Sequence, residues 1–270
     1  MSASQAMPGP YPAGAASNRL NAAMARPIRL AAAGDVHAED ANRDGLARAF
    51  RSIKGDVDLI LLAGDLTTYG EPEQAALLAE ICRPLDVPVY AVLGNHDWHC
   101  NQVPEIVALL SGAGVRVLDR SWAIEEVDGC SVGIVGLKGF IGGFPDSQLP
   151  DFGEPLLRQV YAETTADVEA LDAGLEAVAG SDYRIVLLHY SPTVTTLEGE
   201  PRGIWPFLGT DRLAVPIAEH RPDVVLHGHT HAGRFEGSVG DVPVFNVAVP
   251  VLGRDFFIFE LDGATVRAAA

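Results

Sequence analysis

The chain has 270 residues, of which 48% are hydrophobic and 20% charged, so it has enough apolar material for a sizeable core and wholesale disorder is excluded. Its 36 acidic and 19 basic side chains give a formal net charge of −17, which disfavours binding to nucleic acid or to anionic lipid. The apolar runs are far shorter than the roughly 20 residues that a membrane-spanning helix needs, so no membrane association is expected.

The amino-terminal segment differs in composition from the rest of the chain. Residues 1–26 are rich in Ala, Ser, Pro and Gly and lack the apolar stretch of a secretory signal. We therefore predict a flexible extension over 1–26 and a single domain over 27–270. The three cysteines, Cys82, Cys100 and Cys130, suit neither a disulfide framework nor a zinc site, which favours reduced thiols and a cytoplasmic location.

Strands and helices alternate in the first part of the predicted domain. Three short apolar runs that lead into glycine are predicted as buried strands: 28–33, 56–63 and 87–93. Three segments with helical spacing of apolar residues are predicted as helices: 43–54, 71–82 and 103–112. Because the strands are apolar almost throughout, we expect a parallel sheet that is covered on both faces.

The spacing of the predicted elements changes after the third helix. Three close-set strands are predicted at 115–118, 122–127 and 131–137. The segment 154–179 is predicted to form one long helix or two, and the next predicted elements are a strand at 183–189, a helix at 213–220, a strand at 223–226 and short strands within 234–266. This pattern predicts two sheets packed together with helices outside.

Polar residues follow five of the predicted strands. The polar segments are, in chain order, Asp35-Val36-His37, Gly64-Asp65, Gly94-Asn95-His96-Asp97, His189 and Gly228-His229-Thr230-His231. Ligands bind outside the carboxyl ends of strands in open α/β sheets, so we expect these segments to converge on one rim. Their mixture of oxygen and nitrogen ligands suits Mn, Fe, Zn or Co better than Ca or Mg.

Each of these segments also has a purely structural interpretation. A lone Gly-Asp after a strand is mostly turn chemistry, and a single histidine at a strand end, such as His189, is more often a hydrogen-bonded core residue. Two imidazoles two residues apart, as in His229 and His231, lie on one side of an extended segment and favour metal binding. The joint occurrence of all five segments at strand ends outweighs the structural interpretations.

The five segments together resemble the signature of the calcineurin-like metallophosphoesterases, over roughly residues 27–262. The resemblance implies an α/β fold, a four-layer α/β/β/α sandwich with two mixed sheets and the metal site at the strand carboxyl ends. It also implies two divalent metal ions per chain. The implied ligands are Asp35, His37 and His231 for the first ion, Asn95, His189 and His229 for the second, and Asp65 as the bridge between them.

Two further residues of the third segment are candidates for catalysis. By the resemblance, His96 contacts the phosphate and protonates the leaving oxygen. Asp97 either orients the His96 ring and favours its imidazolium form or caps the helix that follows. Only Asp35 and Asp65 would be anionic ligands, so two dications would leave the site cationic and attract an anionic substrate to an acidic protein.

The sequence differs from two subfamilies of the calcineurin-like metallophosphoesterases, which narrows the choice of subfamily. The run after Asp65 lacks the arginine of the Ser/Thr protein phosphatases, and Thr68 stands where purple acid phosphatases have tyrosine. The sequence is thus closer to a bacterial group of small phosphodiesterases. We expect a dinuclear phosphoesterase that hydrolyses phosphodiester bonds of a small substrate, with a nucleotide-type substrate as one option, by attack of metal-bound hydroxide. The alternatives are a phosphomonoesterase acting on a small metabolite and a non-catalytic metal-binding scaffold on the same fold.

Two segments without metal motifs are predicted to carry specificity. Residues 138–153 and 193–208 are too long for ordinary loops, and either could form a lid. The Phe residues of the first could stack on a base or cap the core, and capping is preferred. Arg202 in the second is a candidate phosphate contact or a solvated loop residue. The expected partner is a small phosphoester substrate, without nucleic acid or membrane, and a homo-oligomer is left open.

Overall fold

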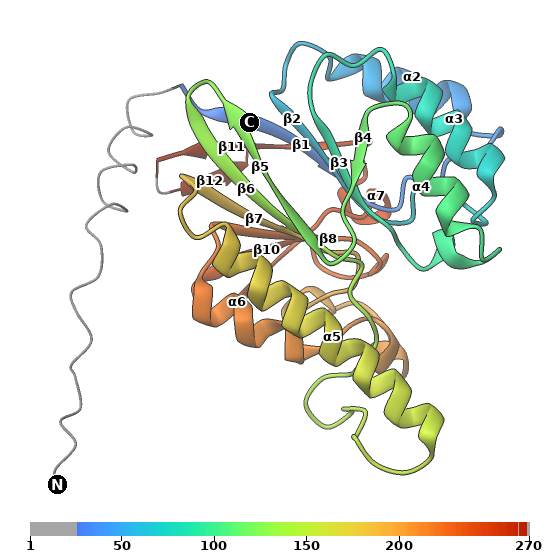
Figure 1. Ribbon diagram of the computed structural model, residues 1–270, viewed down its shortest axis with the longest axis vertical. Helices are drawn as coiled ribbons and strands as arrows, with labels where there is room; N and C mark the ends of the chain where they lie inside the picture. Colours follow the sequence, from blue (N-terminus) through green and yellow to red (C-terminus); the bar gives the residue numbers. More distant parts are fainter. Residues whose placement is uncertain (1–25, 264, 269–270) are drawn as a thin grey trace, which may run out of the picture.

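Two six-stranded sheets lie at the centre of the computed structural model, with helices outside them (Figure 1). The structure describes residues 26–263 and 265–268. The predicted flexible extension, apart from Arg26, lies outside the described residues. Within these ranges, none of the helices combines the length and the apolar character that a bilayer crossing requires.

The first sheet has the strand order β12-β11-β1-β2-β3-β4, in which β1 to β4 run parallel and β11 and β12 are each antiparallel to a neighbour. Its strands are β1 (Ile28–Ala33), β2 (Leu59–Ala63), β3 (Val89–Val92), β4 (Val115–Val117), β11 (Phe257–Asp262) and β12 (Thr265–Ala268). The helices that cover its outer face are α2 (Arg43–Ser52), α3 (Pro72–Cys82) and α4 (Val103–Ser111).

The second sheet has the order β5-β6-β7-β8-β10-β9, with β6, β7, β8 and β10 parallel and the two edge strands antiparallel. Its strands are β5 (Ser121–Val127), β6 (Cys130–Gly136), β7 (Tyr183–Leu187), β8 (Val224–His227), β9 (Glu236–Val239) and β10 (Val242–Asn246). The helices α5 (Pro155–Ala177) and α6 (Ala214–His220) cover its outer face (Figure 1).

Alternation along the strands creates three apolar layers. Ala32 of β1 and Ile185 of β7 belong to the core between the two sheets. Their neighbours point the opposite way, Ala33 toward the helices of the first sheet and Val186 toward those of the second. The strands are therefore buried on both faces, as their apolar sequences predicted. The predicted four-layer α/β/β/α sandwich with two mixed sheets is confirmed.

Two elements differ from the sequence expectation. The segment predicted as one helix or two is the single 23-residue helix α5. The tail, predicted as strands alone, also contains the one-turn helix α7 (Val249–Leu252), which begins at a proline-containing turn and ends at Gly253 with φ of 60°. A four-residue apolar run has no periodicity that separates a helix from a strand, and here the proline and the left-handed glycine decide for the helix.

Candidate metal centre

The five predicted segments come together at one edge of the sandwich. The loops after β1 and β2 are joined by backbone hydrogen bonds, from Asp35 N to Gly64 O at 2.9 Å and from His37 N to Asp65 O at 3.0 Å. In the second sheet, Gly228 N donates to His189 O at 3.2 Å. The carboxyl ends of the parallel strands thus bring polar groups from both sheets to a common rim, as expected.

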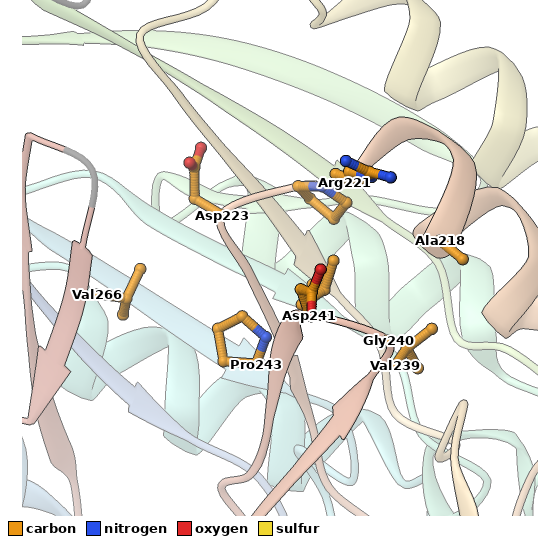
Figure 2. A pocket seen from close by; sticks show the side chains of 10 residues that line it. Ala218, Arg221, Asp223, Val239, Gly240, Asp241, Pro243 and Val266 are labelled. Carbon is orange, nitrogen blue, oxygen red and sulfur yellow. The ribbon is translucent and has the colours of Figure 1, made fainter.

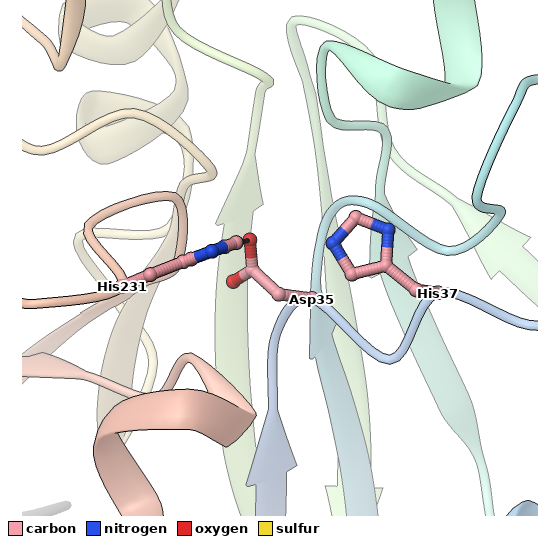
Figure 3. A group of neighbouring side chains, drawn as sticks. All are labelled: Asp35, His37 and His231. Atoms are coloured by element: carbon pink, nitrogen blue, oxygen red, sulfur yellow. Dashed lines mark hydrogen bonds and ion pairs between the residues drawn. The ribbon is translucent and has the colours of Figure 1, made fainter.

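One cluster contains Asp35, His37 and His231. Their ligand atoms lie within 4.8 Å of one another, and Asp35 Oδ1 is 2.7 Å from His231 Nε2. Figure 3 shows the Asp35 side chain between the two imidazole rings, which come from different loops. Burial by itself would raise the pKa of Asp35, but the His231 hydrogen bond and the nearby imidazoles hold it below its ordinary value. The Asp35 carboxylate is therefore ionised at neutral pH.

A second cluster contains Asp65, His189 and His229, whose ligand atoms also lie within 4.8 Å of one another. Asn95 joins it, because its Oδ1 is 2.9 Å from His189 Nε2. The two oxygens of Asp65 point to different clusters. Oδ1 is 3.3 Å from His189 Nε2, and Oδ2 is 3.8 Å from His37 Nε2. Asp65 thus lies between the two groups of ligands.

Hydrogen bonds to backbone carbonyls orient two of the imidazoles. His189 Nδ1 is 2.9 Å from Ala63 O, and His229 Nε2 is 3.2 Å from Phe207 O. A carbonyl only accepts, so these nitrogens carry the protons and the other nitrogen of each ring has a free lone pair. The lone pair of His189 then faces the oxygens of Asn95 and Asp65. Such a gathering of acceptors fits a cation between them.

The protonation states of two half-buried histidines, His37 and His229, fit the same interpretation. Burial lowers the pKa of His229 to about 3, so its imidazole is neutral at physiological pH. Burial also lowers the pKa of His37, against the opposing effect of the carboxylates. Its Nδ1 is a buried nitrogen without a hydrogen-bond partner in the described structure. Neutral imidazole is the form that ligates metal ions.

The backbone at the rim is unusual. Four candidate ligands have positive φ: Asp35 at 58°, His37 at 43°, Asp65 at 49° and His229 at 70°. Non-glycine residues rarely adopt this left-handed region, and each such residue costs on the order of 1–3 kcal/mol unless the surrounding structure enforces it. A concentration of this strain at one rim is typical of a functional site.

Glycines of the motifs make room for the ligands. Gly64 has φ of 81°, and a Cβ there would lie 2.5 Å from the His189 ring. A Cβ on Gly94 would overlap the Asp65 carboxylate. Any larger residue at these positions would push a candidate ligand out of place, which explains why glycine precedes the polar residues.

Comparison with known proteins identifies the family. A family model described as Calcineurin-like phosphoesterase matches residues 28–233, a range that contains all five motif segments. The chain belongs to this family. The predicted resemblance is confirmed, and membership of this family supports the predicted class of enzyme, a metal-dependent phosphoric ester hydrolase. The family implies divalent metal ions, and the two clusters supply ligands of suitable chemistry for them.

Two curated relatives of this calcineurin-like phosphoesterase carry phosphodiesterase names. A probable cyclic nucleotide phosphodiesterase of Synechococcus sp. is 28% identical over 176 residues, which cover 58% of this chain and 66% of the relative. A probable glycerophosphodiester phosphodiesterase GpdQ of Arcobacter nitrofigilis is 41% identical over 46 residues, 17% of either chain. The matches span less than two-thirds of each relative, so what these proteins act on is only a proposal for this chain.

Solved structures share the fold. A phosphopantetheinyl hydrolase from Mycobacterium tuberculosis superposes with a TM-score of 0.61 at 17% identity, over 83% of this chain and 91% of that one. A putative 5′-nucleotidase from Staphylococcus aureus does so with a TM-score of 0.58 at 15% identity, over 90% of this chain and 53% of that one. At these identities the likeness concerns the two-sheet α/β architecture alone.

His96 of this phosphoesterase lies beside the two clusters. Its Nδ1 is 2.7 Å from Thr68 O, so Nδ1 donates to a carbonyl and Nε2 is left to face the site. Nε2 is 3.9 Å from Asp65 Oδ2, and the His96 ring lies 4.7 Å from the His37 ring. His96, His37 and Asp65 form a third group whose ligand atoms lie within 4.8 Å of one another, so His96 lies at the edge of the same centre.

The structure contradicts both sequence interpretations of Asp97. Its carboxylate does not orient the His96 ring, whose Nδ1 partner is the Thr68 carbonyl, and it does not cap the following helix α4, whose N-cap residue is Gln102. Asp97 is fully buried and accepts from Leu66 N, Thr67 N, Thr67 Oγ1 and Gly94 N at 2.6–3.2 Å. The Asp97 side chain points to the backbone N–H groups of these residues, which donate hydrogen bonds to it, and not to the His96 ring. Asp97 therefore joins the loops that carry Asp65 and Asn95.

This arrangement predicts a structural phenotype for Asp97→Asn. The Asn side-chain amide would place its N–H groups against N–H and O–H groups that now donate to the Asp97 carboxylate. We therefore expect the free energy of unfolding to fall by about 1–3 kcal/mol. The activity that remains should depend on leaving-group pKa as in the wild type, since Asp97 does not touch the His96 ring. Denaturant unfolding and rates with two leaving groups measure both. A changed leaving-group dependence at unchanged stability would show that Asp97 acts through His96.

The sequence did not indicate one aromatic residue of the site, Tyr190. Tyr190 is buried directly after His189, and its ring lies 4.4 Å from the His229 ring and 5.5 Å from the His189 ring. It packs behind both imidazoles and limits their movement. The only sign of Tyr190 in the sequence was its position next to the predicted ligand His189. A large side chain beside a histidine at a strand end has the same sequence pattern as an ordinary core residue.

The two segments predicted to carry specificity lie against each other. Gly143 N, in 138–153, donates to Gly209 O at 2.9 Å, next to the end of 193–208. Phe144 is buried with Leu197 and Leu208, which confirms the preference for core capping over stacking at this residue. The second segment contains the short helices η2 (Val194–Thr196) and η3 (Arg202–Phe207), and it is followed by η4 (Asp211–Leu213).

Proposed function

We propose that this protein is a dinuclear metal-dependent phosphodiesterase acting on a small substrate. In this proposal Asp35, His37 and His231 hold one divalent ion, and Asn95, His189 and His229 hold the other. The observation that carries the proposal is the position of Asp65, whose two oxygens lie 3.3 Å from His189 Nε2 and 3.8 Å from His37 Nε2. A carboxylate is the group that can bridge two cations and offset their charge.

Two divalent ions, when bound, polarise the phosphoryl oxygens and supply a nucleophile from water near neutral pH. The chain's own residues would set the geometry and charge around them. Asn95 contributes a neutral oxygen, so the site stays cationic toward phosphate. His96 would hold a proton at Nε2 and donate it to the departing oxygen, with Thr68 O keeping the ring in place. Mn, Fe, Zn or Co fit this mixed oxygen and nitrogen set.

A small diester is favoured over other phosphate substrates for two reasons. The matched relatives are both named as phosphodiesterases. A net charge of −17 opposes the basic surface that a nuclease needs for backbone contacts. We therefore propose that the substrate is a small phosphodiester. The alternative substrate is a monoester of a small metabolite.

Metal removal tests the proposal. We expect a chelator to lower hydrolysis of bis(p-nitrophenyl) phosphate at least about 100-fold, because the ions supply several kcal/mol of transition-state stabilisation. Added Mn²⁺, Co²⁺, Zn²⁺ or Fe²⁺ should restore activity, with two ions per chain by metal analysis.

The same preparation should hydrolyse bis(p-nitrophenyl) phosphate faster than p-nitrophenyl phosphate. The reverse order would replace the diesterase proposal with a monoesterase. Two bound ions without hydrolysis of either ester, in any of the four metals, would favour a metal-binding scaffold.

A further inference from the structure

A cavity of about 560 Å³ has walls that include Val194, Glu198, Glu200, Arg202 and Trp205. It lies against the fifth motif segment. Glu200 Oε1 accepts a hydrogen bond at 2.7 Å from the backbone N–H of Ala232, the residue directly after His231. The backbone of the neighbouring Gly199 approaches Ala232 so closely that a Cβ there would overlap the Ala232 carbonyl oxygen.

The same segment reaches the second metal cluster. Arg202 and Trp205 lie on η3, which ends at Phe207, and the Phe207 carbonyl is 3.2 Å from His229 Nε2. The segment that carries Arg202 and Trp205 thus extends from the cavity to a proposed metal ligand.

A second cavity of similar volume has a different position. It is lined by the end of α6, the β9–β10 turn and β12, where Arg221, Asp223 and Asp241 surround it (Figure 2). These residues precede β8 and β10, so this cavity lies at the amino ends of the strands. The carboxyl ends, which carry the metal motifs, are the end at which α/β sheets bind ligands. Of these two cavities, the one that contains Trp205 is therefore on the side of the proposed metal centre.

Trp205 forms a fixed platform in this cavity. Its indole Nε1 donates to Glu200 O at 3.1 Å, and the ring packs against the buried cluster of Phe144, Leu197 and Leu208. The Arg202 guanidinium lies over the ring, 4.9 Å from its centre. A guanidinium and an indole both present planar faces on which heterocycles stack.

The charges around the platform select among ligands. The positive charge of Arg202, which lies over the indole, opposes a cationic ligand. Asp146, Glu198 and Glu200 line the same cavity. Within the described residues, only Glu198 of these three pairs with an arginine, Arg234, at 2.6 Å. The carboxylates therefore oppose an anionic group beyond the scissile phosphate. A neutral planar heterocycle remains. Its ring nitrogens can accept hydrogen bonds from Arg202, and its amino groups can donate hydrogen bonds to the carboxylates.

We propose that the Arg202–Trp205 pair binds a nucleobase-type heterocycle of the phosphodiester substrate. This inference rests on the proposed function, since the phosphate of the same substrate must be held at the metal centre. The heterocycle stacks on the pair while the phosphodiester linkage lies over Asp65.

Two diesters with one leaving group test this assignment: the p-nitrophenyl ester of adenosine 5′-phosphate and methyl p-nitrophenyl phosphate. Both release p-nitrophenolate, so the ratio of their kcat/KM values reports on the retained group alone. We expect the wild type to prefer the adenosine ester. Trp205→Ala should lower that ratio roughly 5- to 150-fold, the range of base–aromatic stacking. Trp205→Phe should retain most of it, and Arg202→Ala should lower it less.

Trp122→Ala is the matched control, because Trp122 is exposed on the edge strand β5. It should leave the ratio unchanged. Calorimetric binding of adenosine 5′-phosphate to the Mn²⁺-loaded protein gives a readout besides turnover and should weaken in Trp205→Ala. Thermal unfolding of each variant separates a lost contact from a lost fold.

The outcomes distinguish the two proposals. A wild type that hydrolyses both esters equally well overturns the heterocycle site and leaves the diesterase intact. So does a Trp205→Ala variant with a wild-type ratio. If neither ester is hydrolysed in any metal, the proposed function fails. Calorimetry then still decides whether Trp205 binds the adenosine group.

Discussion

Asp65→Asn is expected to abolish turnover and to lower metal content to one ion or none per chain. The two oxygens of Asp65 face His37 and His189, so this carboxylate is the group that both proposed ions share. A neutral amide has one oxygen and no charge to offset two cations. The loss of kcat/KM should reach roughly 10³-fold or more, since the paired ions contribute several kcal/mol to the transition state. Metal analysis and bis(p-nitrophenyl) phosphate hydrolysis measure both effects.

The matched control is Asp172→Asn, the same chemical change on the surface of α5. Asp172 is exposed and pairs with His220 at 2.7 Å, away from the motif loops. This variant should keep wild-type metal content and activity. Two ions at full occupancy with normal turnover in Asp65→Asn would show that Asp65 does not bridge metals.

His96→Ala is expected to keep both ions and to lose roughly 10²–10⁴-fold in kcat with an alcohol leaving group, the usual size of general acid catalysis. The penalty should be smaller with p-nitrophenolate, which departs without protonation. The physical basis is the orientation of the ring, because Thr68 O accepts from Nδ1 and leaves Nε2 facing the site. The experiment compares two diesters that differ in leaving-group pKa, with metal content measured in parallel.

Three other results would change the role of His96. An equal penalty with both leaving groups would mean that His96 grips the phosphate without donating a proton. Reduced metal content would make it a ligand. Wild-type rates on both diesters would remove it from the mechanism. His220→Ala, a substitution of the half-buried last residue of α6 that pairs with Asp172, should behave as wild type in every measurement.

The family and the architecture could be predicted because their signals are local. Each parallel strand is a short apolar run that leads into a polar segment, and parallel strands in one sheet bring such segments to one edge. The order of the five segments then identified the family, although His189 by itself resembled an ordinary core histidine. The helix α7 was missed because its four apolar residues carry no period.

The pairing of atoms within the site was decided by the tertiary structure. Asp35 meets His231 across 196 residues, and Asn95 meets His189 across 94. Which oxygen of Asp65 faces which imidazole depends on left-handed backbone angles at the rim. Asp97 shows the same limit: its spacing beside His96 suggested an ion pair, yet its carboxylate turns to the amides of Leu66, Thr67 and Gly94.

The sequence by itself determined the fold class, the family and the residues that gather at the strand ends. Only the tertiary structure decided that Asp65 lies between two clusters, that Asp97 supports the loops, and that Trp205 lines a cavity. The reason is that periodicity and strand-end chemistry act between residues close in sequence. A side chain's direction and its partners are set by the backbone angles of loops and by contacts between distant segments, which no local pattern encodes.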